Sequence, residues 1–195
     1  MPLNYLAHAY LSFGSEYILV GNMVSDFVKG KAILQFPDPV QRGIRLHRLI
    51  DAFTDAHPVT KAASQHLAPA VGRYSGAFLD IIYDHFLATD TSRFLPGALE
   101  PFTVGVYALL RKQTPILPPA FIQTLGYMEK FNWLFHYSQR SGIQRSLEGM
   151  VRRAAYLPDD APVYSLFEQH YAELGNSYRL FFPELEAYTR QQFAL

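Results

Sequence analysis

The sequence predicts an all-α fold. Apolar residues recur at helical spacing through most of the chain, and no stretch of alternating apolar and polar residues is long enough to indicate a sheet. Hydrophobic residues make up 49% of the 195 positions, which is enough to fill the core of one domain. We therefore expect residues 1–195 to form a single helical domain, because no repeat, low-complexity tract or linker divides them.

The N-terminal half is expected to contain five helices. Gly14 and Gly30 follow the first two, and Pro39 occupies the first position of the third, where its missing N–H is tolerated. The predicted helices span residues 4–11, 21 or 22 to about 28, 39 to 54 or 55, 59–67 and about 70–88. Their apolar stripes must be buried, so these helices are expected to pack on one another.

Prolines divide the C-terminal half into further helices. Pro101 precedes one of them and Pro119 begins the next. The predicted helices span residues 102–112, 119–137, 141–155 and 162–194, the last with a break near Pro183. The all-α prediction therefore holds from one end of the chain to the other.

Composition narrows the classes of partner and of metal ligand. Lys plus Arg and Asp plus Glu both number 17, so the formal charge is zero and a general attraction to nucleic acid or to a membrane is not indicated. The chain has no cysteine, which leaves imidazole, carboxylate and water as metal ligands, a set that suits Mn, Mg, Fe or Zn. There is no signal-peptide pattern at the N-terminus and no apolar run of the roughly 20 residues that cross a bilayer, so we expect a soluble cytoplasmic protein.

Two segments place acids and imidazoles among large apolar residues. On a helix, His47 and Asp51 would share one face with apolar side chains, and Asp80 and Asp84 would share another. Such groups are costly to bury unless they are paired or bind a metal. The segments therefore favour a metal site inside a helical domain.

Each of these residues also has a plainer interpretation. His47 and Asp51 can form an ordinary hydrogen-bonded pair, and Asp26 can be a capping acid. His8, in an apolar helix, can be a core histidine that donates to a backbone carbonyl, or it can contact substrate. These alternatives stay open on the residues alone. Four further histidines are assigned no function, because His57 precedes Pro58 at a helix end and His66, His136 and His170 lie in segments with no carboxylate at ligand spacing.

Other catalytic motifs are absent from the sequence. It contains no phosphate-binding glycine loop, no G-x-S-x-G elbow and no H-E-x-x-H helix. Basic residues do follow a three-residue step at Arg42, Arg45 and Arg48, with Lys29 and Lys31 before them. This patch is either a solvated surface or the place where a phosphate or an acidic partner binds.

Six short motifs together resemble one known family, the acyl carrier protein phosphodiesterases. The motifs are Asn4-Tyr5-Leu6-Ala7-His8, Gly21-Asn22, Asp26-Phe27-Val28-Lys29-Gly30, Leu46-His47-Arg48 with Ile50-Asp51, Thr54-Asp55, and Asp84-His85-Phe86-Leu87. The resemblance extends over nearly the whole chain and is most specific before residue 90. It implies a divergent HD-type helical bundle that cleaves 4′-phosphopantetheine from holo-acyl carrier protein, with manganese as the expected metal and magnesium or iron as alternatives.

A working hypothesis for the site follows from the motifs and the chemistry. Asp26, His47, Asp84 and His85 form the metal shell, and Asp51 and Asp80 are either alternate ligands or groups that orient the imidazoles. The expected catalytic residues are these four ligands and Asp51. The adjacent pair runs Asp84 then His85, the reverse of the HD signature, so ligand roles are not transferred from that wider group. The expected substrate contacts are His8, Lys29, Arg45 and Arg48.

Two other functions are compatible with the same residues. One is a phosphohydrolase that acts on a nucleotide or another small phosphoester, and the other is a non-catalytic module that binds a carrier protein. Holo-acyl carrier protein is the expected partner, nucleic acid and membrane are not, and the sequence predicts no oligomeric state.

Overall fold

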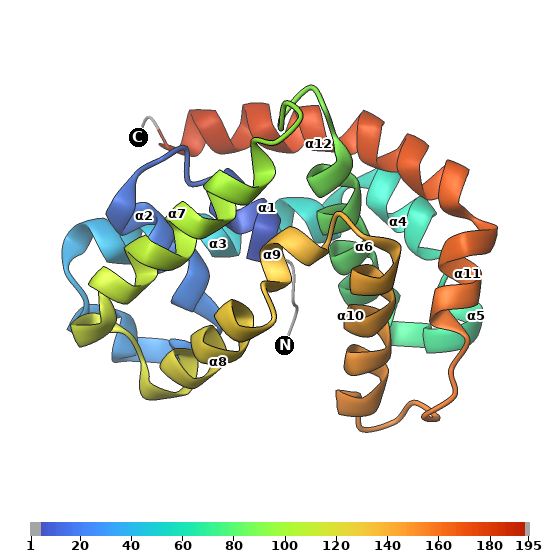
Figure 1. Ribbon diagram of the computed structural model, residues 1–195, viewed down its shortest axis with the longest axis horizontal. Helices are drawn as coiled ribbons and strands as arrows, with labels where there is room; N and C mark the ends of the chain where they lie inside the picture. Colours follow the sequence, from blue (N-terminus) through green and yellow to red (C-terminus); the bar gives the residue numbers. More distant parts are fainter. Residues whose placement is uncertain (1–4, 194–195) are drawn as a thin grey trace.

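The computed structural model describes residues 5–193, and within that range every regular element is helical (Figure 1). The α-helices are α1 (Tyr5–Tyr10), α2 (Glu16–Val24), α3 (Asp38–Ala56), α4 (Pro58–Ser64), α5 (Ala68–Val71), α6 (Ser75–Thr89), α7 (Leu99–Lys112), α8 (Pro119–Lys130), α9 (Trp133–His136), α10 (Arg140–Arg153), α11 (Val163–Gln169) and α12 (Tyr171–Phe193). Short 3-10 turns, η1 (Ser25–Phe27), η2 (Gly30–Gln35), η3 (Gly72–Tyr74) and η4 (Thr114–Ile116), connect some of them. The all-α prediction is confirmed.

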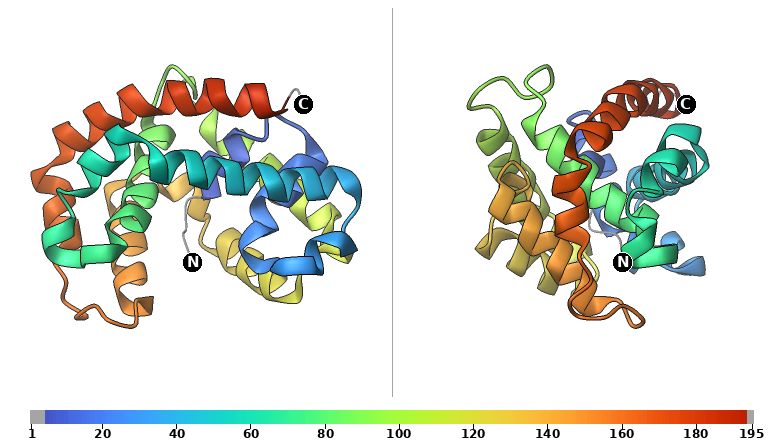
Figure 2. Two further views of the ribbon diagram at one scale, coloured as in Figure 1. Left: turned by 180° about the vertical axis from the view of Figure 1, so that it is seen from behind. Right: turned by 90° about the vertical axis from the view of Figure 1, so that its right-hand side faces the viewer.

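The helices are arranged around α6. This helix contacts α1, α4, α10 and α12, and most of its residues from Phe78 onward are buried. The long helix α12 runs along one edge of the molecule, with α3 and α4 beside it (Figure 2). Helices α7 and α8 lie on the side of α2, whereas α5, α10 and α11 lie on the opposite side (Figure 1). The described residues include no helix of the length and hydropathy needed to cross a bilayer.

Helices α2 and α3 approach each other unusually closely, and two glycines permit this. A Cβ atom on Gly21 would lie 2.2 Å from the carbonyl oxygen of Val40, and one on Gly43 would lie 2.4 Å from that of Ile18. Both distances are far below van der Waals contact, so no larger residue fits at either position without moving a helix. The close crossing brings Asn22, the residue after Gly21, next to α3.

Several predicted boundaries are wrong, each for a local reason. The second helix begins at Glu16 rather than near residue 21, and its predicted end is the 3-10 turn η1. The helix predicted over residues 70–88 is interrupted by η3, where Gly72 has a φ of 49°. The helix predicted over residues 119–137 is interrupted at Asn132, whose φ is 43°; asparagine adopts this left-handed conformation more readily than most residues.

The predicted break near Pro183 is also wrong. Helix α12 continues through Pro183, and the break lies instead at His170, between α11 and α12. Pro183 is exposed, while Phe181, Phe182 and Leu185 around it are buried. The missing N–H of the proline therefore costs one helical hydrogen bond, and the packing of its neighbours offsets that loss. The predicted C-terminal end, residue 194, lies outside the described residues.

Candidate metal centre

Two buried imidazole rings lie against each other at the junction of α1, α2 and α3. His8 comes from α1 and His47 from α3, and their ring centroids are 3.9 Å apart with an angle of 17° between the planes. The side chains are 1% and 5% exposed. Two stacked imidazolium cations would repel each other strongly at this depth, so at least one ring must be neutral.

Asn22 of α2 holds both rings in place. Its side-chain amide nitrogen donates to the carbonyl of His8 and to the hydroxyl of Ser12, which identifies its Oδ1 as the acceptor facing His8. His8 Nδ1 lies 2.9 Å from this oxygen, and His47 Nδ1 lies 2.7 Å from the backbone carbonyl oxygen of the same Asn22. Both acceptors require a proton on Nδ1, so each neutral ring presents the lone pair of Nε2.

The two Nε2 atoms point toward carboxylate oxygens without forming hydrogen bonds. The Oδ1 of Asp51 lies 3.3 Å from His8 Nε2, and its Oδ2 lies 3.2 Å from His47 Nε2. Asp26, from η1, places its Oδ1 3.4 Å from His47 Nε2. Both Nε2 atoms are buried and neither has a hydrogen-bond partner among the described residues. Lone pairs that face carboxylate oxygens repel each other unless a proton or a cation lies between them.

The donor atoms fit a divalent cation. The ligand atoms of His8, His47 and Asp51 lie within 4.8 Å of one another, a spacing that one ion can bridge. Two imidazoles with one carboxylate form a nitrogen and oxygen set that suits first-row metals such as manganese and iron, and also zinc. Asp51 and Asp26 are 34% and 21% exposed, so the site is closed on the imidazole side and reached by solvent on the carboxylate side.

The pKa values of these groups follow from burial and from the neighbouring charges. Burial lowers the pKa of His8, and the charge of His47 lowers it further, so this ring stays neutral. Burial also acts to lower the pKa of His47, but Asp26 and Asp51 outweigh it and raise that pKa to about 9. The two histidines hold the pKa of Asp51 well below its usual range, although burial opposes them. Without a metal, therefore, His47 takes up a proton and keeps Asp51 ionised.

Asp84 does not join this cluster. Its Oδ2 accepts a hydrogen bond of 2.9 Å from the backbone N–H of Leu6, and its Oδ1 accepts one of 2.8 Å from that of Ala7. These are unpaired donors of the first turn of α1, which is the helix that carries His8. Burial raises the pKa of Asp84, and the two N–H donors act against this rise. Asp84 therefore positions α1, and we replace its predicted role as a metal ligand by this one.

His85 also lies apart from the cluster. Its Nδ1 is 2.6 Å from the carbonyl oxygen of Tyr137, and its Nε2 is 3.1 Å from the hydroxyl of Tyr171. The ring packs against Phe86 and Phe167. Adjacent residues on a helix diverge by about 100°, so Asp84 and His85 face different neighbours, and both nitrogens of His85 have partners. The structure does not bring His85 together with His47.

The expected substrate-contacting cations occupy different surroundings. Arg48 donates to the carbonyl of Val28, which places it beside the segment that carries Asp26. Arg45 instead donates to Gln41 and borders a groove with Leu49 near the end of α12. Lys29 is exposed and directly follows Val28. Of these three residues, Arg48 is therefore hydrogen-bonded to the segment that carries Asp26, and Lys29 belongs to the chain directly after it.

Asp80 lies close to the carboxylates of α3. It is half-buried and borders a cavity of about 50 Å³ together with Asp55 and Lys61. Burial raises its pKa well above the usual range, and the charges of Asp51 and Asp55 add to this effect. Asp80 therefore lies near the cluster, and its surroundings favour the protonated form of its own carboxyl group.

Two important features of the cluster are not evident from the sequence. Asn22 was part of a recognised motif, but nothing in its spacing indicated that one residue orients two histidines. His8 was expected to contact substrate, whereas its Nε2 lies among the possible metal ligands. Ser12 supports the arrangement, since it donates to the carbonyl of His8 and accepts from Asn22, but these contacts are visible only in the structure.

Comparison with known proteins agrees with the motifs in the sequence. A family model described as acyl carrier protein phosphodiesterase matches residues 3–185. Proteins of that name from Yersinia pestis and from Escherichia coli O157:H7 are 30% and 32% identical to this chain. The alignments cover 94% and 95% of this chain, and 95% and 96% of the two relatives. No solved structure matches the chain. The chain belongs to the acyl carrier protein phosphodiesterase family.

Proposed function

We propose that this protein is a metal-dependent phosphodiesterase that cleaves 4′-phosphopantetheine from holo-acyl carrier protein and leaves apo-acyl carrier protein. The name shared by its relatives supports the reaction and the substrate. The geometry of the two unpartnered Nε2 atoms, both facing Asp51, supports the dependence on a metal. Manganese is the metal we infer from the family resemblance, with magnesium and iron as alternatives.

In this proposal His8, His47 and Asp51 hold the cation. When bound, a divalent ion would polarise a phosphoryl oxygen and lower the pKa of a nearby water toward neutrality. Asn22 fixes both Nδ1–H groups and so keeps each Nε2 free to act as a ligand. Asp84 keeps α1 in place and thereby the position of His8.

Asp26 is the carboxylate best placed to handle protons. It is more exposed than the histidines, and its Oδ1 faces His47 at the open side of the cluster. A carboxylate in this position can accept a proton from the attacking water. Arg48 and Lys29, beside the same segment, are the cations that we expect to bind the non-bridging phosphate oxygens.

Mass spectrometry of holo-acyl carrier protein after incubation with the enzyme and Mn²⁺ tests this function. A loss of roughly 340 Da, the mass of the phosphopantetheine group released by diester cleavage, is the expected result. His47→Ala should abolish both this loss and the tight binding of Mn²⁺. His66→Ala is a matched control, because His66 lies against His170 and not in the cluster.

Two results would contradict the proposal. A wild-type protein that binds no divalent ion and leaves the carrier intact would favour the non-catalytic module. A higher activity on small phosphodiesters than on the carrier protein would favour the phosphohydrolase of small substrates.

A further inference from the structure

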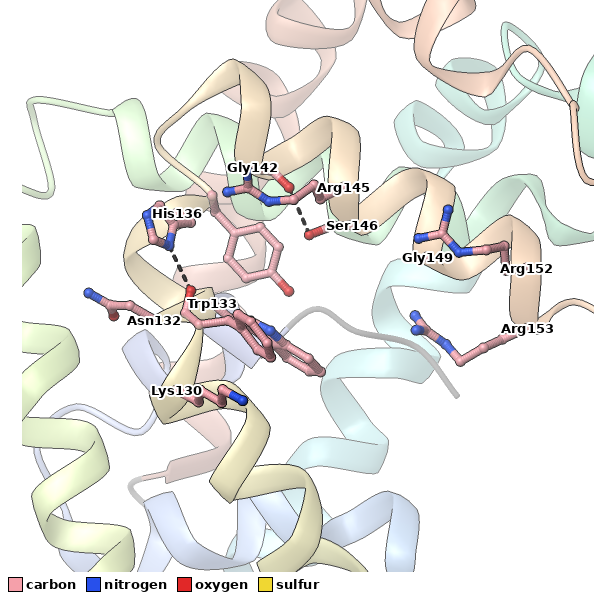
Figure 3. A pocket seen from close by; sticks show the side chains of 12 residues that line it. Lys130, Asn132, Trp133, His136, Gly142, Arg145, Ser146, Gly149, Arg152 and Arg153 are labelled. Atoms are coloured by element: carbon pink, nitrogen blue, oxygen red, sulfur yellow. Dashed lines mark hydrogen bonds between the residues drawn. The ribbon is translucent and has the colours of Figure 1, made fainter.

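A cavity lies between the end of α8, α9 and α10. Its volume is about 430 Å³, within the range of small-molecule sites in proteins. Figure 3 shows its two walls, with Lys130 and Trp133 on one side and Arg152 and Arg153 of α10 extending toward them from the other. None of the residues assigned to the metal centre lines it.

Among the described residues, the lining of this cavity is basic and contains no acid. It is formed by Lys130, Phe131, Asn132, Trp133, His136, Tyr137, Gly142, Arg145, Ser146, Gly149, Arg152 and Arg153. Of its four cations, Arg152 alone has a carboxylate partner among the described residues, at 3.9 Å from Glu148. Several cations on the wall of one cavity repel each other, and they are stabilised when an anion binds between them.

Arg152 and Arg153 both line the cavity from α10 and extend toward its opposite wall (Figure 3). Partial burial lowers the pKa of the Arg153 guanidinium, Tyr137 acts against this, and the neighbouring charge of Arg152 lowers the pKa further. Arginine binds phosphate oxygens with two parallel hydrogen bonds, so either guanidinium can hold a phosphate bound in the cavity. The α10 wall is therefore suited to a phosphate ester.

The opposite wall is suited to an uncharged chain. Trp133 and Phe131 contribute aromatic surface, and the backbone in this wall turns sharply at Asn132. Tyr137 extends this surface toward α10. An extended arm with amide and methylene groups can lie along such a surface, because aromatic rings offer apolar contact at low entropic cost.

We propose that this cavity binds an organic phosphate with an extended uncharged arm, with the phosphate held by Arg152 and Arg153 and the arm lying along Trp133. This proposal rests on the proposed function, in which the group that is released, 4′-phosphopantetheine, has this chemistry. The ligand is the free product after cleavage, because in the proposed function the phosphate of the attached arm lies at the metal centre.

Trp133 makes the test direct, because it is the sole tryptophan of the chain. Its fluorescence is measured during titration with 4′-phosphopantetheine, with pantetheine, which lacks the phosphate, and with inorganic phosphate. We expect a saturable change with 4′-phosphopantetheine and affinities about tenfold or more lower for each of the other two, because pantetheine lacks the charge-assisted hydrogen bonds to arginine and inorganic phosphate lacks the arm that contacts Trp133.

Matched variants locate the binding site. Arg153→Gln should weaken the binding of 4′-phosphopantetheine about tenfold or more, which is the loss expected for one charge-assisted contact. Arg179→Gln is the control, because Arg179 is exposed on α12 and bonds to Asn176 of the same helix. An equal affinity of wild type and Arg153→Gln, or an equal affinity for inorganic phosphate and for 4′-phosphopantetheine, would overturn the proposal.

The same experiment separates this proposal from the proposed function. His47→Ala should keep the fluorescence change while it loses hydrolysis, because His47 does not line the cavity. A wild type that binds 4′-phosphopantetheine but does not cleave the carrier would disprove the function and leave the cavity proposal standing. An active enzyme without a saturable fluorescence change would support the function and disprove the cavity proposal. The KM for holo-acyl carrier protein should be unchanged in Arg153→Gln, and a raised KM would overturn the assignment of the cavity to the free product.

Discussion

The pair His47 and Asp51 on α3 and the pair Asp84 and His85 on α6 contain the same two residue types, but their surroundings differ. On α3 the residues are four apart and share one face, so both reach the junction with α1 and α2. On α6 they are adjacent and diverge, so Asp84 binds the first turn of α1 while His85 binds Tyr137 and Tyr171. A buried acid and imidazole therefore do not by themselves indicate a metal site.

The polar atoms left without partners distinguish the two pairs. Both oxygens of Asp84 and both nitrogens of His85 have hydrogen-bond partners, so the fold itself stabilises them. The Nε2 atoms of His8 and His47 have none. A buried polar atom without a hydrogen-bond partner lowers the stability of the fold. Two such Nε2 atoms beside the carboxylate of Asp51 therefore favour a bound cation.

The largest expected effect on stability is that of Asp84→Ala. The change leaves the N–H groups of Leu6 and Ala7 buried and unsatisfied, so we expect a loss of about 3 kcal/mol from the two buried donors. Chemical denaturation measures this loss. A position in the metal shell would predict lost activity without lost stability, whereas the hydrogen bonds of Asp84 predict lower stability. An unchanged denaturation midpoint would contradict the structural role.

The affinity for Mn²⁺ should rise with pH. His47 has a pKa raised to about 9, and a metal must displace its proton, so below pH 9 each unit of increase should strengthen binding about tenfold. His8 does not add to this slope near neutrality, because its pKa is lowered. Calorimetric titration at pH 7 and pH 8 checks the slope. An affinity independent of pH would mean that His47 is not a ligand.

Asn22→Ala should weaken Mn²⁺ binding about 10- to 100-fold, the usual effect of removing a group that orients a metal ligand. The variant removes the acceptor of His8 Nδ1 but keeps the backbone carbonyl that binds His47. Metal titration of the folded variant measures the loss. Ser12→Ala removes a different hydrogen bond of the same amide and is the control. An effect of Ser12→Ala as large as that of Asn22→Ala would point to a structural role for the amide.

His85→Leu should have the smallest effect on function. We expect a destabilisation of about 1–2 kcal/mol, because the carbonyl of Tyr137 loses its donor. The affinity for Mn²⁺ and the rate of cleavage should stay unchanged in the folded variant. Denaturation and metal titration on the same sample separate the two effects. A lower metal affinity would restore His85 to the metal shell.

Much of the fold could be predicted from the sequence, because helical periodicity is a local property. The third helix, for example, was predicted from residue 39 to 54 or 55 and spans Asp38–Ala56, since a proline near its start and a His-Pro step after it mark both ends. The break at His170 could not be predicted in this way, because no glycine or proline occurs there. That break depends on the packing of α11 and α12 against other helices.

The sequence by itself determined the all-α class, the family and the residue types of the site, because motifs and periodicity are carried by neighbours along the chain. Tertiary structure alone decided which of those residues meet. Asn22 reaches both histidines because Gly21 and Gly43 let α2 and α3 approach closely, and Asp84 acts on residues 77 and 78 positions away. Spacing along a helix determines the direction of a side chain, but only the packing of helices determines what lies there.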